Sequence, residues 1–171
     1  MTATGAEWER RLTALWAELE TFDGDGLAFV VRMATLTAEL PPDSAVGLFE
    51  RGAAHDSTGS PDQAVPLYEA ALTVGLTGER RRRAVIQLAS SLRNLGRPQE
   101  AVTLLTAEAQ MPSDPLDGAV ATFLALALAD LGREREAVAV ALTALAPLLP
   151  RYNRSVARYA RQLVEGTDPE A

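Results

Sequence analysis

The chain has 171 residues and a formal net charge of −7, from 23 acidic residues and 16 basic ones, all of which are arginine. It contains no cysteine, which excludes disulfides, thiolate nucleophiles and cysteine-based metal sites. The length suits one domain with an ample core, and an aromatic content of only 5% favours helices over a sheet. We interpret the exclusive use of arginine as a mark of a GC-rich bacterial genome.

The charge is divided unevenly along the chain. Residues 1–78 carry 4 arginines against 12 acids, a net charge of −8, whereas residues 79–171 carry 12 arginines against 11 acids, a net charge of +1. Nucleic-acid-binding domains are usually basic, so binding to nucleic acid is not expected from this balance. The N-terminus lacks the pattern of an export signal, and no apolar stretch reaches the roughly 20 residues of a membrane span. We therefore expect a cytoplasmic protein without a membrane segment.

The first 41 residues are predicted to form a helical hairpin. Two segments, about 5–21 and 26–40, carry apolar residues at helical spacing. These residues are Trp8, Leu12, Leu15, Trp16 and Leu19 in the first segment and Phe29, Met33, Leu36 and Leu40 in the second. The Asp-Gly-Asp-Gly sequence at 23–26 lacks the later ligands of a calcium loop and is interpreted as a turn. We expect this hairpin to cap the fold and its tryptophans to anchor the core.

Three copies of one motif follow the hairpin. Glycines at positions 59, 96 and 132 recur at intervals of 37 and 36, and each is followed by four mostly polar residues and then Ala-Val. This pattern predicts a hinge between two helices, in which a left-handed glycine ends the first helix. The alanines at 64, 101 and 137 would let the paired helices approach to roughly 8–10 Å. Ser60 and Gln63 predict a capping box at the first hinge.

These motifs resemble the tetratricopeptide-repeat family over about 110 residues of the chain. The family's small, glycine, alanine and aromatic positions are matched best in the first repeat, by Gly52, Gly59, Ala64, Tyr68, Ala71 and Leu72. The second repeat matches with Ala89, Gly96 and Ala101, and the third with Ala125, Gly132, Ala137, Ala144 and Leu145. The resemblance implies an all-α fold, a right-handed α-solenoid of antiparallel helix pairs with about nine helices.

We expect a single solenoid domain over residues 1–171. Its predicted parts are the N-terminal hairpin 1–41, repeat 1 at 42–78, repeat 2 at 79–113, repeat 3 at 114–149, a capping helix at 150–166 and a tail at 167–171. Asp114 is predicted to cap the first helix of repeat 3. Two stretches of that repeat, 119–129 and 137–149, are apolar almost all round, so they indicate either a deeply embedded repeat or a surface for a homodimer.

Arginines dominate two further segments. Residues 80–83 are four consecutive arginines, which we expect to form a solvated helix end. In the capping helix, one stripe of residues is predicted to be buried: Tyr152, Val156, Tyr159 and Leu163. A second stripe is predicted to be exposed: Arg151, Arg154, Arg158 and Arg161. This second stripe either faces solvent as the end of the stack or docks anionic groups.

We predict that the chain is a non-enzymatic protein–protein interaction module. The groove implied by the resemblance is predicted to hold a peptide segment or partner helix through its polar or acidic groups. The predicted partner-binding residues are Phe49, Arg83, Gln87, Ser90, Asn94, Phe123, Arg158 and Arg161. Self-association through the apolar third repeat is the first alternative, and binding of nucleic acid or other anions through the arginines is a less favoured one. We predict no catalytic residue, cofactor or metal, because phosphate-loop and paired-carboxylate motifs are lacking and His55 is the only histidine.

Overall fold

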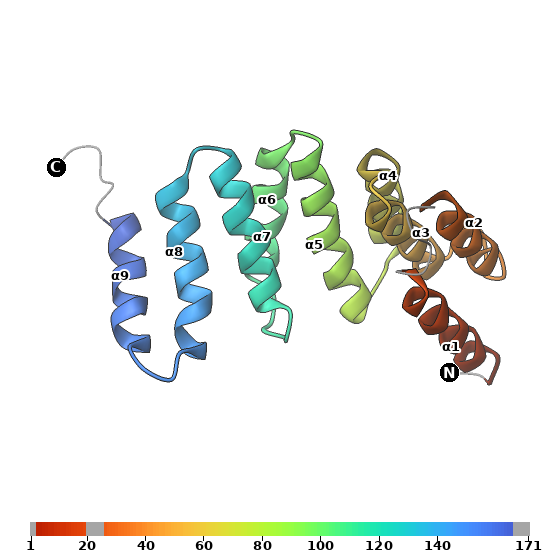
Figure 1. The fold of residues 1–171 in the computed structure, drawn as a ribbon, viewed down its shortest axis with the longest axis horizontal. Helices are drawn as coiled ribbons and strands as arrows, with labels where there is room; N and C mark the ends of the chain where they lie inside the picture. The colour runs from red at the N-terminus through yellow and green to blue at the C-terminus, as the bar shows by residue number, and fades with distance from the viewer. Residues whose placement is uncertain (1–2, 20–25, 166–171) are drawn as a thin grey trace. The chain divides into compact units, whose positions relative to one another are not determined.

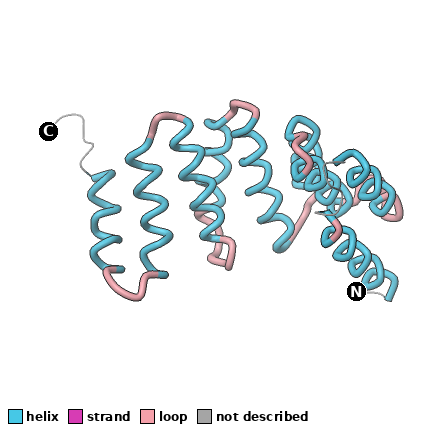
Figure 2. Tube along the Cα trace, in the orientation of Figure 1, coloured by secondary structure: helices cyan, strands magenta, loops and turns pink. Residues whose placement is uncertain are grey.

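In a computed structural model, residues 3–19 and 26–165 are described, and every regular element in these ranges is helical (Figure 1, Figure 2). The helices are α1 Ala3–Ala17, α2 Gly26–Thr37, α3 Ala45–Ser57, α4 Pro61–Val74, α5 Gly78–Asn94, α6 Pro98–Glu108, α7 Asp117–Asp130, α8 Glu134–Leu145, the 3₁₀ helix η2 Ala146–Leu148, and α9 Asn153–Glu165. The predicted all-helical fold is confirmed. Within the described ranges, no helix is both long and apolar enough to cross a bilayer.

The chain divides into two compact units, residues 1–80 and 81–171. The single-domain organisation therefore stays a prediction. The first unit contains α1 to α4, and the second contains α6 to α9 together with most of α5. Residues 23–25 of the expected turn lie outside the described ranges.

In the first unit, α1 and α2 pack through the apolar faces that their spacing predicted. The core of this hairpin consists of Trp8, Leu12, Leu15, Phe29, Met33 and Leu36, with Ala54 of α3 against them. The Trp8 indole Nε1 donates a 3.0 Å hydrogen bond to the carbonyl of Leu36, so the polar atom of a 6% exposed side chain is satisfied. The Trp16 and Phe29 rings lie 5.2 Å apart between centroids. Both tryptophans therefore anchor the core, as predicted.

The three glycine hinges share one backbone geometry. Gly59, Gly96 and Gly132 have φ of 82°, 74° and 71°, the left-handed region that favours glycine. In each hinge, the residue after glycine donates its N–H to the carbonyl five residues earlier: Ser60 to His55 at 2.9 Å, Arg97 to Leu92 at 2.9 Å, and Arg133 to Leu128 at 3.0 Å. This bond is that of a Schellman motif, which ends a helix by satisfying its last carbonyls. The predicted hinges are therefore confirmed.

The small residues of the motif lie where the paired helices meet. Ala64 and Ala101 are fully buried, and Ala137 is buried as well. In the α3–α4 pair, Gly52 lies directly against the ring of Tyr68, which is 0% exposed. The capping-box prediction is wrong, because the Ser60 side chain makes no capping hydrogen bond. Its backbone carbonyl instead accepts the N–H groups of Gln63 and Ala64.

The first helix of the predicted repeat 3 begins later than the sequence predicted. The Asp114 carboxylate accepts the N–H of Leu116 at 2.7 Å, which closes a local turn instead of capping a helix. The helix α7 starts at Asp117. From there, α7, α8 and α9 follow one another as antiparallel neighbours (Figure 1).

The predicted buried stripe of the last helix is wrong. Tyr152 precedes α9 with a φ of 68° and is 75% exposed, and Tyr159 is 53% exposed. The fully buried residue of α9 is Ala160, whose single methyl group allows close packing. Val156 and Leu163 are half-buried. The chain therefore leaves two large aromatic side chains bare at its C-terminal end.

Candidate functional site

Four of the predicted binding residues lie on one face of α5. They are Arg83, Gln87, Ser90 and Asn94, spaced by four, three and four residues, so they stand one above another on the helix. Asn94 is exposed, and the other three are half-buried. The side-chain oxygen of Gln87 is enclosed and has no hydrogen-bond partner among the described residues. This face therefore presents amide, hydroxyl and guanidinium groups.

An ion pair ties this part of α5 to α7. Arg93 of α5 pairs with Asp130 of α7 through its Nε. Residues three or four apart share a helix face, so Ser90 lies beside Arg93 on α5, and Leu126 lies one turn before Asp130 on α7. Leu126 is 41% exposed. We name this surface the α5–α7 face and define it by Arg83, Gln87, Ser90 and Asn94 on α5, and Thr122, Leu126 and Ala129 on α7.

The two predicted aromatic anchors differ in burial. Phe49 of the first unit is 0% exposed and packs against Tyr68, with 6.1 Å between ring centroids. It is therefore a core residue and presents no surface to a partner, because its apolar ring is enclosed where α3 meets α4. Phe123 of α7 is half-buried.

The expectation that residues 80–83 form a solvated helix end is wrong. In the first unit, Arg80 Nε donates to Glu50 Oε1 at 2.8 Å, and its Nη atoms bind Glu9 at 2.6 and 3.0 Å. The Glu50 side chain is 2% exposed and also accepts the Trp16 indole N–H at 2.9 Å. Burial lowers the pKa of Arg80, but the hydrogen bonds with Glu9 and Glu50 outweigh it, so this pKa is raised.

In the second unit, the buried Arg82 fixes the start of α7. Arg82 is 5% exposed and its Nη1 donates at 3.0 Å to the Glu108 carboxylate, while its Nη2 lies 2.5 Å from Asp117 Oδ1. The Arg81 guanidinium binds the same Glu108 at 2.6 Å. A buried charge is stable only when it is paired in this way. Arg81 and Arg82 of α5 therefore both bind the end of α6, and Arg82 also binds the start of α7.

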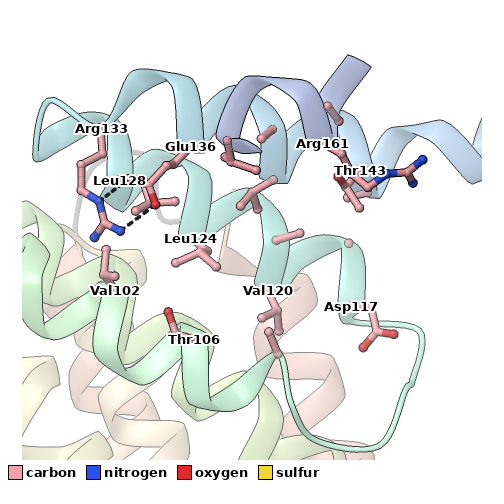
Figure 3. A pocket seen from close by; sticks show the side chains of 18 of the residues that line it. Val102, Thr106, Asp117, Val120, Leu124, Leu128, Arg133, Glu136, Thr143 and Arg161 are labelled. Carbon is pink, nitrogen blue, oxygen red and sulfur yellow. Dashed lines mark hydrogen bonds and ion pairs between the residues drawn. The ribbon is translucent and has the colours of Figure 1, made fainter. Parts of the chain in front are cut away.

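The second unit also contains a pocket that the sequence did not predict (Figure 3). Its volume is about 700 Å³, and its lining comes mainly from α6, α7, α8 and α9, with Arg82 of α5 beside them. Apolar side chains form most of its wall, among them Val102, Val120, Leu124, Leu128 and Val140. Small residues of α8 and α9, Ala139, Ala144 and Ala160, leave the space open. We name this cavity the α6–α9 pocket.

Charged groups lie along the edge of the α6–α9 pocket. Arg133 pairs with Glu136 at 2.7 Å on one side, where its hydrogen bond is the main cause of the lowered pKa of Glu136 (Figure 3). The pKa of Asp117 is also lowered, first by the Ser113 hydroxyl, which donates to it at 2.5 Å. Besides Arg82, the remaining charged residue of the lining is Arg161. No ion pair joins it to any residue of 3–19 or 26–165.

The predicted arginine stripe of α9 is exposed. Arg151, Arg154, Arg158 and Arg161 all face solvent. The Arg158 guanidinium lies over the Tyr159 ring, 5.0 Å from its centroid, in a cation–π contact. Of the predicted binding residues, only Arg161 lines the α6–α9 pocket.

The arrangement of these side chains suits binding. Within the described residues, no group of three or more histidine and acidic side chains could hold a metal ion. His55 is half-buried in α3. The second unit thus contains two candidate sites, the α5–α7 face and the α6–α9 pocket. The sequence signal that could have indicated the pocket is the alternation of small and large apolar residues along 137–147, because the small residues leave space between the helices.

Comparison with known proteins returned one result. A family model described as tetratrico peptide repeat matches residues 45–163. None of the curated proteins and none of the solved structures matches the chain significantly.

Proposed function

Because the chain belongs to the tetratrico peptide repeat family, whose repeats generally mediate protein–protein interaction, we propose that it is a non-enzymatic module that binds a partner on its α5–α7 face. The ligand is a peptide segment or a helix of the partner protein. A cytoplasmic location and a bacterial source remain predictions.

The observation that carries this proposal is the ion pair between Arg93 and Asp130. It joins α5, which carries the polar stripe, to α7, which carries the exposed Leu126, and this supports a surface that both helices share. Protein interfaces combine such an apolar contact with polar groups that fix orientation. A surface that was polar throughout would be an ordinary solvated face.

The side chains of the α5–α7 face define the ligand's chemistry. Leu126 provides an apolar contact for one side chain of the ligand. The amide of Asn94 and the hydroxyl of Ser90 can exchange hydrogen bonds with a peptide backbone. The guanidinium of Arg83 favours an acidic group at the same end of the ligand, since arginine binds carboxylates bidentately.

Site-specific photo-crosslinking tests this proposal. A benzophenone amino acid placed at position 126 of α7 is expected to crosslink a partner protein in cells of the source organism. The same amino acid at Thr103, an exposed position of α6, is the control. Crosslinks to other proteins from position 103 alone would contradict the assignment of the α5–α7 face.

A pair of matched variants measures the energetics of the same contact. Asn94→Ala combined with Leu126→Ala should weaken the crosslinked partner's affinity at least tenfold in calorimetry, because it removes a hydrogen-bonding amide and an apolar anchor. Gln99→Ala combined with Thr103→Ala, which changes exposed residues of α6, should leave the affinity unchanged. Equal affinities for both double variants would rule out the α5–α7 face.

Self-association is the second candidate function, because the third repeat leaves apolar side chains bare. Val138 and Leu145 of α8 are each 46% exposed, and Leu148 of η2 is 78% exposed. A homodimer that covers them would gain roughly 25 cal/mol for each Å² of apolar surface buried. Sedimentation equilibrium decides this point: a monomer at concentrations of tens of micromolar would exclude the homodimer.

A further inference from the structure

The α6–α9 pocket lies on the opposite side of α7 from the α5–α7 face. Leu124 lines the pocket and Leu126 belongs to the face. Two positions along an α-helix correspond to a rotation of about 200°. A ligand in the pocket therefore leaves the α5–α7 face free, and the two surfaces can be tested separately.

The form of the pocket suits side chains of a protein. Its volume of about 700 Å³ falls inside the range of roughly 300–1,000 Å³ that is usual for ligand pockets. Val120 and Leu124 of α7 lie between Val102 of α6 and Thr143 of α8 in the view of Figure 3. Such a concave wall takes an aliphatic or aromatic side chain, whereas a flat lipid surface cannot fill it.

The charges around the pocket favour an anion. Arg82 pairs with Asp117 and also with Glu108 and Asp114, and Arg133 pairs with Glu136. Arg161 is the one charged lining residue that forms no ion pair with the described part of the chain. It stands at the edge of the cavity, with its guanidinium directed away from the apolar wall (Figure 3).

The cationic surface continues beyond the pocket along α9. Arg158 and Arg154 lie three and seven residues before Arg161 on the same side of the helix, so the three cations span roughly 10 Å. None of them forms an ion pair with the described part of the chain, although their side chains are exposed. A small carboxylic acid could reach only one of these cations. A polypeptide with several carboxylates could reach all three.

We propose that the α6–α9 pocket and the arginines of α9 form a second docking site, which takes an acidic amphipathic segment of a partner protein. A bulky apolar side chain of the segment enters the pocket against Leu124. Its glutamate or aspartate side chains pair with Arg161, Arg158 and Arg154. The exposed Tyr159 ring lies beside the Arg158 guanidinium, so it adds an apolar contact at the same place.

Selection from a random peptide library displayed on phage tests the proposal with the whole protein as bait. The enriched peptides are expected to combine several acidic residues with a Leu, Phe or Trp. Their affinities are then measured by fluorescence anisotropy for three variants. Arg158→Ala with Arg161→Ala removes the cations, Thr143→Trp fills the pocket from an exposed position of its rim, and Asn94→Ala with Leu126→Ala changes only the α5–α7 face.

The first two variants should each weaken the selected peptides at least tenfold, and the third should leave their affinity within twofold of the wild type. The affinity should also fall as salt concentration rises, because the pairing is exposed to solvent. The proposal would be overturned if the selected peptides had no acidic bias. It would also be overturned if acidic peptides bound equally well to the wild type, to Thr143→Trp and to the arginine double variant. Loss of binding only in the third variant would assign the peptides to the α5–α7 face instead. Binding of phosphatidylserine vesicles or single-stranded DNA through these arginines, with no acidic peptide selected, would show that the partner class is wrong.

Discussion

Gly52→Ala adds one methyl group at the closest contact between α3 and α4. A Cβ atom at this position would lie 2.9 Å from Tyr68 Cδ1, 3.0 Å from its Cε1 and 3.3 Å from Leu67 Cβ. These distances are shorter than ordinary van der Waals contacts, so the ring or the helix has to move. The ring of Tyr68 is 0% exposed and packs against Phe49, which is equally buried. We therefore expect the two helices to be forced apart.

The two opposing contributions decide the sign of the effect. Overpacking a well-filled core costs about 1–3 kcal/mol. Alanine in place of glycine inside a helix returns about 0.5–1 kcal/mol. The free energy of unfolding should therefore fall by about 1–2 kcal/mol. It is measured by urea denaturation, with the loss of helix monitored by circular dichroism. Gly118→Ala in α7 is the matched control, because nothing lies within 4 Å of its added Cβ, and it should stabilise by about 0.5 kcal/mol.

A double-mutant cycle identifies the clash itself. If the Tyr68 ring is what opposes the new methyl group, Gly52→Ala should cost nothing in a Tyr68→Leu background. A Gly52→Ala protein that is as stable as the wild type, or a cost that persists without the ring, would refute this account of the α3–α4 contact.

Three further predictions concern packing and charge. Ala101→Leu should overpack the second hinge and cost about 1–3 kcal/mol by urea denaturation, whereas Gln99→Leu, at an exposed position beside it, should be nearly neutral. Glu50→Ala should lower the free energy of unfolding by about 2–4 kcal/mol in the same assay, since it leaves the Arg80 guanidinium and the Trp16 indole N–H without their shared acceptor. A loss below about 0.5 kcal/mol would mean that water replaces the carboxylate. Ser113→Ala should raise the pKa of Asp117 in a carboxyl NMR titration, because that hydroxyl stabilises the charged form. The native pKa is lowered, so this carboxylate stabilises the fold above its ordinary pKa, and the contribution disappears as pH falls through the native value; an unchanged Asp117 titration would exclude the hydroxyl as the cause.

The sequence alone determined the helical elements and the hinges between them. The apolar spacing of Trp8, Leu12 and Leu15 predicted α1, and the glycines at 59, 96 and 132 predicted hinges that share one left-handed geometry. Both signals are local, because helix periodicity and the steric freedom of glycine depend on neighbouring residues. The membership of the tetratrico peptide repeat family, and with it the α-solenoid fold class, agrees with the resemblance of these motifs.

Side-chain environments that depend on distant residues were predicted less well. The four arginines at 80–83 looked like a solvated run, yet Arg82 is buried because Glu108 and Asp117, from two other elements, converge on it. Likewise, Phe49 occupies a groove position of the family but is enclosed by its packing against Tyr68. Helical spacing gives the angle of a residue around its own helix. It does not give the partner that the helix brings to that angle.

The candidate sites show the same division. The stripe from Arg83 to Asn94 follows from spacing within one helix, and so does the exposed arginine stripe of α9. The α6–α9 pocket depends on how closely four helices pack, which the volumes of alanines such as Ala139 and Ala160 set only after the helices are assembled. The sequence therefore determined which residues lie on each face of each helix. The tertiary structure decided which of these residues are buried, which are paired, and where space remains between the helices. Those outcomes depend on contacts between segments that are far apart in the chain.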